Sequence, residues 1–181
     1  MNIFDPALRF EGERFLLRPL CESDLDDLFA VYSDKRALPY FNSDNCHGDN
    51  FYYPTRERMA GALAFWRESF EKRQFVRLSV VDKANGRVVG TVELCRRVSS
   101  DAFNGMIILR VDVRSDYETE SALGELFALL APLSREGGLL TKAAPYAVDR
   151  IAAVKRAGFA LSPDSLIGWD GRVYGDYWTL R

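Results

Sequence analysis

The stretch LRVDVRSDYETESALGEL, residues 109–126, contains a strand pattern followed directly by a helix pattern. Apolar residues alternate with charged ones up to Val113, and beyond the junction they recur at helical spacing. The first N–H groups of a helix are unpaired and carry partial positive charge, so such a junction suits a phosphate group. This junction, however, carries Asp116, Glu118 and Glu120. The stretch therefore raises the question of whether it binds an anion at all.

The segments on either side of this junction predict a meander and a parallel strand pair. Residues 75–98, FVRLSVVDKANGRVVGTVELCRRV, contain two alternating runs joined by a loop with Asn85-Gly86, which is typical of a β-hairpin. The run GMIILRVDV at 105–113 is expected to pair with the second of them. GGLLTKAAP at 137–145 predicts a strand after the helix, and a strand–helix–strand unit requires a parallel pair.

The N-terminal third alternates between strand, helix and loop patterns. ERFLLRPL at 13–20 predicts a first strand, ended by Pro19. Ser23 is placed to cap a short amphipathic helix, and Thr55 to cap a second helix. Residues 35–54 between these helices have no periodicity but contain five aromatic residues, which favours a functional loop over disorder.

The C-terminal segments predict a last helix and a closing hairpin. Asp149 is expected to cap the helix, and Gly158 to end it in a left-handed conformation. Residues 165–180 are expected to form a hairpin that turns at Asp170-Gly171. Because no repeat or linker is present, residues 1–181 are expected to form a single domain.

Composition excludes several classes of function. The chain of 181 residues has 24 basic and 26 acidic side chains, without the basic footprint of a nucleic-acid-binding protein. Its three cysteines are far apart and lack metal-ligand spacing, which favours a reducing compartment and predicts no metal site. No signal pattern or membrane-spanning run is present. We expect a cytoplasmic protein without nucleic-acid or membrane partners.

Four segments in order resemble the GNAT superfamily of acyl-CoA-dependent N-acetyltransferases, in particular its ribosomal-protein N-terminal acetyltransferase branch. They are ERFLLRPL at 13–20, GRVVGTVEL at 86–94, RAGF at 156–159 and DGRVYGDYW at 170–178. The resemblance implies an α/β (α+β) fold, with a mixed, mostly antiparallel central sheet and helices on both faces. It also implies acetyl-CoA as cosubstrate and an amine of a small molecule or peptide as acceptor.

The resemblance places a CoA pyrophosphate loop on the opening stretch, but the side chains depart from the family pattern. Glu118 stands for Gln/Arg, Ser121 for Gly and Leu123 for Gly/Ala, and an Asn and a Ser of the family fall on Ala147 and Arg150. Backbone N–H groups do not depend on side-chain identity. The implied cofactor-binding residues are therefore Glu118, Thr119, Ser121, Ala122 and Leu123, with N–H groups of Val111 and Val113 for the thioester carbonyl.

The acidic side chains leave two interpretations of this loop. A carboxylate about 5 Å from a phosphate costs on the order of 3 kcal/mol at an effective dielectric constant near 20. CoA binding is then expected only if Lys142, Arg114 or Arg150 compensates the charge. In the other interpretation the acids complement the helix dipole and bind nothing.

Two carboxylates on central strands are candidate general bases, namely Glu93 and Asp112. Strand alternation places Arg110 and Asp112 on one face of their strand. The alternative to catalysis is therefore a cross-strand ion pair of Arg110 with Glu93 or Asp112. Tyr177 is a candidate proton donor to the thiolate, and simple packing is its alternative role.

The aromatic loop falls where the resembled family forms its acceptor wall. The implied acceptor-binding residues are Tyr40, Phe41, Phe51 and Tyr52, and nearby carboxylates would favour a cationic amine. The alternative is a hydrophobic plug. The sequence as a whole carries two functional hypotheses: an N-acetyltransferase, or a degenerate GNAT-like ligand-binding or protein-interaction module that has lost CoA binding. A homodimer that shares the acceptor site is a third possibility.

Overall fold

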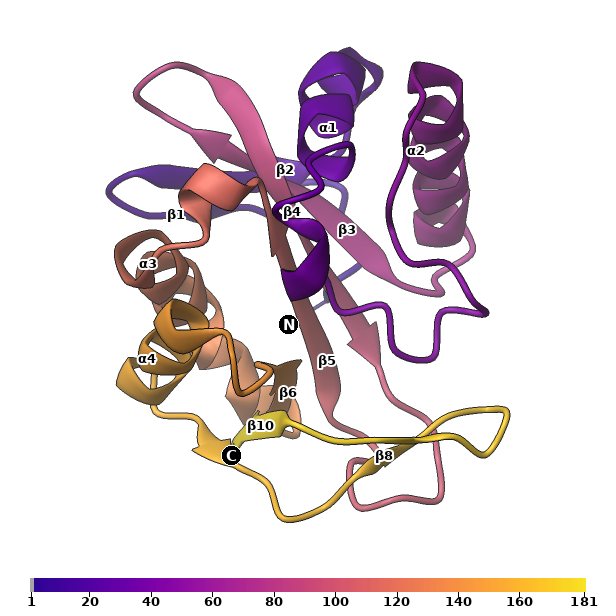
Figure 1. Ribbon diagram of the computed structural model, residues 1–181, viewed down its shortest axis with the longest axis vertical. Coiled ribbons are helices and arrows are strands. Elements are labelled where there is room, and N and C mark those ends of the chain that lie inside the picture. Colours follow the sequence, from indigo (N-terminus) through magenta and orange to yellow (C-terminus); the bar gives the residue numbers. More distant parts are fainter. Residues whose placement is uncertain (1) are drawn as a thin grey trace.

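The computed structural model describes residues 2–181 and contains, in that range, a central sheet of eight strands in the order β1-β2-β3-β4-β5-β6-β10-β7 (Figure 1). Neighbouring strands are antiparallel except for β5 and β6, which are parallel. This confirms the predicted mixed, mostly antiparallel sheet. The strands are β1 (Phe10–Glu11), β2 (Phe15–Pro19), β3 (Val76–Asp82), β4 (Arg87–Arg96), β5 (Ile107–Val113), β6 (Leu139–Lys142), β7 (Ala160–Leu161) and β10 (Tyr177–Leu180).

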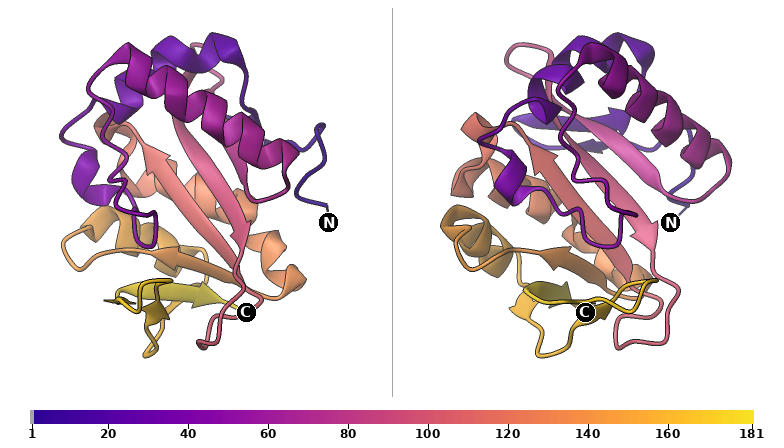
Figure 2. Two further views of the ribbon diagram at one scale, coloured as in Figure 1. Left: turned by 90° about the vertical axis from the view of Figure 1, so that its right-hand side faces the viewer. Right: turned by 45° about the vertical axis from the view of Figure 1, so that its right-hand side comes forward.

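Helices cover both faces of the sheet, as predicted (Figure 2). On one face α1 (Leu25–Tyr32) and α2 (Arg56–Glu71) bury Leu28, Met59 and Trp66. On the other face α3 (Glu120–Leu130) and α4 (Val148–Arg156) pack on the apolar side of β3, β4 and β5. Short 3₁₀ turns are η1 (Glu22–Asp24), η2 (Leu38–Tyr40), η3 (Ser115–Tyr117) and η4 (Ala131–Glu136).

Of the three predicted helix caps, one is confirmed and two differ from expectation. Thr55 caps α2 as predicted, because its side chain accepts a hydrogen bond from the Arg58 N–H group. Ser23 lies inside η1, and α1 follows Asp24 instead. Asp149 lies in the first turn of α4, whose N-cap is Ala147. In the first turn Asp149 complements the helix dipole, which explains an acidic residue at this position.

The β3–β4 hairpin confirms the strongest local prediction, and Gly86 adopts a positive φ of 70° in its loop. The close approach of β4 to β5 requires a second glycine in this hairpin, Gly90. A Cβ atom at Gly90 would collide with the backbone carbonyl oxygen of Asp112 on β5 and with Val113. The absence of a side chain therefore lets β4 and β5 pair closely at this point.

Strands β5 and β6 diverge along the sheet. They pair only at Ile107 with Leu139 and at Ile108 with Leu140, whereas β5 continues to Val113. The backbone edge of β5 beyond Ile108 is therefore not covered by β6. This divergence opens toward the start of α3, which begins at Glu120, one residue before the predicted start at Ser121.

The closing hairpin is present as β8 (Leu166–Ile167) and β9 (Val173–Tyr174), with Gly171 at a φ of 79°. The chain then continues into β10, which inserts between β6 and β7 in the central sheet. The aromatic loop contains only η2 as regular structure, and Asn45, His47 and Phe51 all have positive φ. No helix among residues 2–181 is both long and apolar enough to cross a membrane.

Candidate active site

The start of α3 presents free backbone donors to solvent. Thr119 is the N-cap, and its hydroxyl oxygen accepts a hydrogen bond from the Ala122 N–H group at 3.3 Å. The Leu123 N–H group bonds to the Thr119 carbonyl at 3.0 Å. The N–H groups of Glu120 and Ser121 lie in the first turn and have no intrahelical acceptor. Of the predicted loop residues in the first turn, Ser121 thus offers its amide, while Ala122 and Leu123 donate theirs to Thr119.

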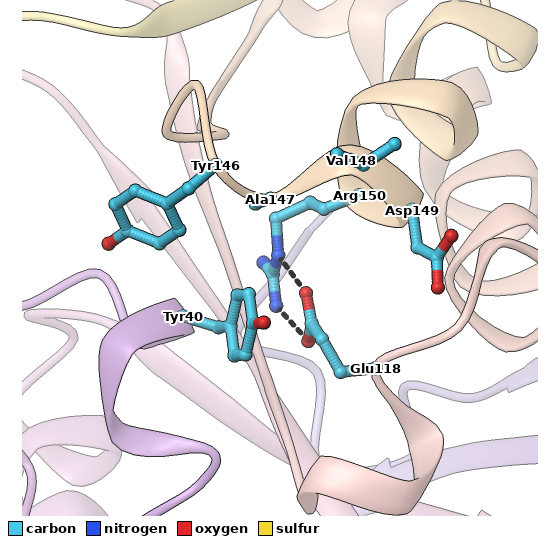
Figure 3. Close-up of a pocket in the computed structure, with 7 residues that line it drawn as sticks. All are labelled: Tyr40, Glu118, Tyr146, Ala147, Val148, Asp149 and Arg150. Carbon is cyan, nitrogen blue, oxygen red and sulfur yellow. Dashed lines mark hydrogen bonds and ion pairs between the residues drawn. The ribbon is translucent and has the colours of Figure 1, made fainter.

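The most buried acidic residue of this loop, Glu118, is neutralised by Arg150 from α4. The Arg150 Nε and Nη2 atoms donate to the two carboxylate oxygens, each at 2.7 Å, and both side chains are almost completely buried (Figure 3). Glu118 and Arg150 occupy two of the positions at which the sequence departs from the family pattern. The two departures therefore compensate each other as a bidentate ion pair.

The other two acids of the loop are paired closer to the surface. Arg114 donates to Asp116 at 2.6 and 2.8 Å, and it lowers the pKa of that carboxyl group by hydrogen bonding. Glu120 forms an exposed ion pair with Arg156. Arg114 and Arg150, two of the three cations considered from the sequence, thus compensate negative charge in this loop. The third, Lys142, pairs with Asp44 instead.

Arg150 also occupies the divergence between β5 and β6. Its Nη1 atom donates to the carbonyl oxygen of Val111 at 2.9 Å. This carbonyl points away from β4, and strand alternation directs the peptide edge of Val113 the same way. Val111 and Val113 thus present their backbone groups to the unpaired edge of β5, where the Val111 carbonyl is already bonded to Arg150.

Two tyrosines cover the Glu118–Arg150 pair from outside. Tyr40 of η2 and Tyr146 lie with ring centroids 6.1 Å apart, and the Tyr146 hydroxyl donates to the Pro39 carbonyl at 2.6 Å. A pocket of about 170 Å³ remains around the pair. Figure 3 shows the side chains that line it. Its lining residues are Tyr40, Glu118, Tyr146, Ala147, Val148, Asp149 and Arg150.

The start of α3 and the open edge of β5 fit acyl-CoA at the surface. Deeper between β5 and β6, side chains leave little room for it. The free amides at the start of α3 and the open edge of β5 are suitable for a diphosphate and for an amide-containing chain. The interior is filled by the Arg150 side chain, and the Tyr40–Tyr146 contact covers it. Binding along β5 therefore requires Arg150 to leave the Val111 carbonyl and the tyrosines to separate.

A second group of charges lies on the opposite face of the sheet, beneath α1 and α2. Glu93 on β4 and Arg110 on β5 are directly opposite in the strand register and form an ion pair. The predicted cross-strand pair is therefore present. Arg77 on β3 also pairs with Glu93 and donates to Asp112 at 3.2 Å. We call Arg77, Glu93, Arg110 and Asp112 the sheet ion network.

Within this network the two carboxyl groups have pKa values shifted in opposite directions. Burial raises the pKa of Glu93, but the charges of Arg110 and Arg77 outweigh it and hold the pKa below its usual value. Burial dominates at Asp112 and raises its pKa despite the nearby Arg77. One oxygen of Asp112, Oδ1, is buried without a hydrogen-bond partner among the described residues. Glu93 thus favours the ionised form more strongly than Asp112 does.

Tyr177 is buried in β10 and bonded to the aromatic loop. Its hydroxyl donates to Asp44 Oδ2 at 3.1 Å, and Lys142 donates to the same oxygen at 2.5 Å. Burial and the charge of Asp44 raise the pKa of Tyr177 above its usual value. The hydroxyl therefore stays protonated at neutral pH.

The largest of the three described pockets, about 780 Å³, lies between α2, the aromatic loop and strands β3, β4 and β5. We call it the α2 pocket. Glu93 lines it, whereas Asp112 and Tyr177 do not. Its side chains include the aromatic residues Phe51, Tyr53, Phe65, Trp66 and Phe75 and the charged residues Asp49, Arg58, Arg77, Glu93, Arg96, Arg97 and Arg110.

The predicted acceptor residues are spread over different parts of the molecule. Phe51 lines the α2 pocket. Tyr40 and Phe41 line small pockets beside α4, on the Arg150 side. Tyr52 instead lies under the Lys35 ammonium, 6.0 Å from its ring centroid. The four side chains therefore do not form one wall, because the loop turns sharply at its positive-φ residues.

Sequence reasoning missed Arg77 and Trp66. The Arg77 guanidinium lies 4.3 Å from the centroid of the Trp66 ring and bridges Glu93 and Asp112. An available signal was the position of Arg77 between Val76 and Leu78 in a mostly apolar strand, where a charge needs a buried partner. Among residues 2–181 no cluster of three or more His, Cys, Asp or Glu side chains could hold a metal ion.

Comparison with known proteins identifies the family. A family model described as "Acetyltransferase (GNAT) domain" matches residues 14–159. No curated protein sequence matches the chain.

Solved structures with the same fold include three GNAT or ribosomal-protein acetyltransferases. A GNAT-family acetyltransferase from Bacillus anthracis has a TM-score of 0.69 at 12% identity, over 96% of this chain and 98% of that one. A ribosomal-protein-S5-alanine acetyltransferase from Vibrio fischeri has a TM-score of 0.64 at 17% identity, over 95% and 94%. RimL, a ribosomal L7/L12 α-N-protein acetyltransferase in complex with coenzyme A, has a TM-score of 0.66 at 12% identity, over 96% and 97%.

The family model covers most of the chain, including the diverging strands and the start of α3, and the solved structures share the fold over nearly its full length. The chain belongs to the GNAT acetyltransferase family.

Proposed function

We propose that the protein is an acyl-CoA-dependent N-acetyltransferase that acts on an amine of a small molecule or peptide. The observation that carries this proposal is the divergence of β5 from β6 beyond Ile108, beside the free amides of the α3 start. Support also comes from family membership and from the CoA complex of a protein with the same fold. The proposal also includes a cytoplasmic location and a homodimer. It includes no nucleic-acid or membrane partner.

In this proposal the backbone holds the cosubstrate. Ser121 offers its N–H group and hydroxyl to the diphosphate, and Thr119 holds the first turn of α3 in place. The N–H groups of Val111 and Val113 are assigned to the acyl chain and the thioester carbonyl. Acetyl-CoA supplies the activated acetyl group. Ala122 and Leu123 contribute the packed side of the helix start, and Glu118 holds Arg150 when the cleft is empty.

Proton transfer in the proposal uses Glu93 and Tyr177. Glu93 is the candidate carboxylate that lines the α2 pocket, so it is placed to accept the proton that the amine loses during attack. Asp112 then acts through Arg77, which it contacts, and not on the acceptor directly. The Tyr177 hydroxyl supplies the proton that the departing thiolate needs, once it turns away from Asp44.

Calorimetry with acetyl-CoA tests the proposal. We expect binding by the wild-type protein and at least a tenfold weaker affinity for Ser121→Glu, because the added carboxylate faces the diphosphate. Ala128→Glu is the matched control, since Ala128 is exposed on the same helix away from its start.

Absence of binding by the wild-type protein at millimolar acetyl-CoA would contradict the proposal. It would favour a second function, a GNAT-fold module that has lost CoA binding and binds another ligand or a protein. The observation that favours this alternative is the Arg150 side chain bonded inside the cleft.

A further inference from the structure

Tyr177, the proposed proton donor, is completely buried. A tyrosine that gives its proton to a leaving group has to regain one before the next reaction. Until then the tyrosinate is a buried charge beside the Asp44 carboxylate, and both burial and the like charge make that state costly. A proton donor in this position therefore needs a route to solvent.

The hydrogen bonds of Tyr177 lead outward to Lys142 through one carboxylate oxygen. Asp44 Oδ2 accepts a hydrogen bond from the Tyr177 hydroxyl at 3.1 Å and another from Lys142 Nζ at 2.5 Å. Exposure increases along this line, from 0% at Tyr177 to 14% for the Asp44 side chain and 24% for the Lys142 side chain. We call Tyr177, Asp44 and Lys142 the Asp44 cluster.

The surrounding backbone holds the cluster in place. Tyr177 and Lys142 are directly opposite in the register of β10 and β6, and Lys142 Nζ lies 5.9 Å from the centroid of the Tyr177 ring. The Asp44 N–H group donates to Asn42 Oδ1 at 3.1 Å, and the Asp44 carbonyl accepts a hydrogen bond from Arg110 at 3.1 Å. The Asp44 carboxylate is therefore fixed between the hydroxyl and the ammonium group.

The outer end of the cluster lies beside the strand divergence. Lys142 is the last residue of β6. Together with Asn42 and Arg150 it lines a pocket of about 70 Å³. Arg150 in turn donates to the Val111 carbonyl in the divergence. The cluster thus connects the buried hydroxyl with a hollow next to the proposed path of the cosubstrate.

Proton affinities favour transfer toward Tyr177. In water an alkylammonium group and a phenol have similar pKa values, about 10.4 and 10. Burial and the charge of Asp44 raise the pKa of Tyr177. Its tyrosinate form is therefore basic enough to take a proton from an ammonium group.

We propose that Lys142 and Asp44 form a proton path from solvent to Tyr177 and reprotonate it after each acetyl transfer. The Tyr177 O–H bond breaks when its proton goes to the leaving sulfur. An N–H bond of Lys142 then breaks, its proton passes over the Asp44 carboxylate to re-form the Tyr177 O–H bond, and solvent returns a proton to the Lys142 amine.

Both Asp44 and Lys142 act through Tyr177 and are positioning residues. This inference rests on the proposed acetyltransferase function for the use of the Tyr177 proton, and on the Asp44 cluster for the path by which the proton returns.

Exchange of the Tyr177 hydroxyl proton with solvent tests the path in the resting protein. Nuclear magnetic resonance of protein labelled with ¹³C at tyrosine Cζ, in equal volumes of H2O and D2O, distinguishes the protonated and deuterated forms of a slowly exchanging hydroxyl. Tyr177→Phe assigns the signal. We expect Lys142→Arg to slow the exchange at least about tenfold, because a guanidinium group keeps the positive charge beside Asp44 but does not release its proton at neutral pH.

A second variant and a matched control accompany this measurement. Asp44→Asn, made separately, should also slow the exchange, since an amide accepts the hydrogen bond but does not pass a proton on. Lys155→Arg is the control, because Lys155 on α4 lies 5.8 Å from the ring centroid of Trp178, next to Tyr177 in β10, and outside the Asp44 cluster. Unchanged exchange in either folded variant, or equal slowing in Lys155→Arg, would overturn the path.

Acetyl transfer tests how the path is used, with acetyl-CoA and a peptide that begins with alanine as probes. A single turnover, with protein in excess over acetyl-CoA, needs only the proton already on Tyr177. We expect Lys142→Arg to keep the single-turnover rate of the wild type and to lower the steady-state rate severalfold. A lower single-turnover rate would show that Lys142 acts on the transfer step, and would overturn its role in reprotonation.

The outcomes separate this inference from the proposed function. Exchange that depends on Lys142 and Asp44, in a protein that does not bind acetyl-CoA, would support the path and contradict the acetyltransferase. Acetyl-CoA binding together with unchanged exchange in Lys142→Arg would overturn the path alone.

Discussion

The sheet ion network and the ion pairs at the start of α3 contain similar residues in different surroundings. In the network Arg77 is completely buried and contacts two carboxylates at once. At the start of α3 the pairs range from the buried Glu118–Arg150 to the exposed Glu120–Arg156. Water screens an exposed pair, while a buried charge that loses its partner keeps its desolvation cost. Burial therefore decides which of these pairs the fold depends on.

The largest effect is expected for Arg77→Met, because this change leaves Glu93 and Asp112 buried without their shared cation. We expect the free energy of unfolding to fall by about 3–5 kcal/mol. Arg114→Gln, at the start of η3 and partly exposed, should lower it by less than about 1 kcal/mol. Urea denaturation measures both. Similar losses in the two variants would mean that the network contributes no more than a surface pair.

The next largest effect distinguishes the buried ion pair at the start of α3 from the exposed one. A double-mutant cycle with Glu118→Gln and Arg150→Met should give a coupling energy of about 2 kcal/mol, because both groups are buried. The same cycle with Glu120→Gln and Arg156→Met should give only a few tenths of a kcal/mol. Equal coupling energies from denaturant unfolding would show that burial does not distinguish the pairs.

A smaller effect concerns pH dependence within the sheet ion network. The folded-state pKa of Asp112 is raised, so its contribution to stability is present at low pH and is lost as the pH rises above about 4. The folded-state pKa of Glu93 is lowered, so its contribution is present at neutral pH and is lost as the pH falls below about 4.5.

Unfolding free energies measured from pH 3 to pH 8 check these signs. Relative to wild type, Asp112→Asn should become more stable as the pH rises, and Glu93→Gln should become more stable as the pH falls. If both differences change with pH in the same direction, the assignment of opposite shifts is wrong.

The smallest effect contrasts two glycines, one in a helix and one in the central sheet. Gly61 lies in the interior of α2 with open space at its Cβ position, so Gly61→Ala should raise the free energy of unfolding by about 0.5–1 kcal/mol. Gly90→Ala should instead lower it, since the added methyl group meets the Asp112 carbonyl. Thermal unfolding detects both changes, and stabilisation by Gly90→Ala would contradict the close approach of β4 and β5.

Local patterns in the sequence predicted much of the fold and part of the site. Alternation in 75–98 predicted the hairpin. The faces that alternation assigned to Glu93 there and to Arg110 in 105–113 led to their cross-strand pair. The strand–helix–strand pattern predicted the parallel pairing of β5 with β6. These features depend on residues that are close in sequence or follow a strict period, so pattern alone identifies them.

Contacts between distant segments were predicted less well. Arg150 was one of three cations considered for the acidic loop, but its bidentate pairing with Glu118 depends on how α4 packs beside α3. The grouping of Tyr40, Phe41, Phe51 and Tyr52 was expected from their proximity in sequence, and sharp turns in the loop separate them. An irregular loop has no period that assigns its side chains to a face.

The sequence by itself determined the order of the elements, the mixed sheet and the acidic character of the 109–126 stretch, because these follow from periodicity and composition. Only the tertiary structure decided that Asp116, Glu118 and Glu120 each have an arginine partner and that Arg150 bonds inside the strand divergence. Ion pairing requires atoms within a few ångströms of each other. That proximity arises when α3, α4 and β5 pack together, from segments up to 39 residues apart.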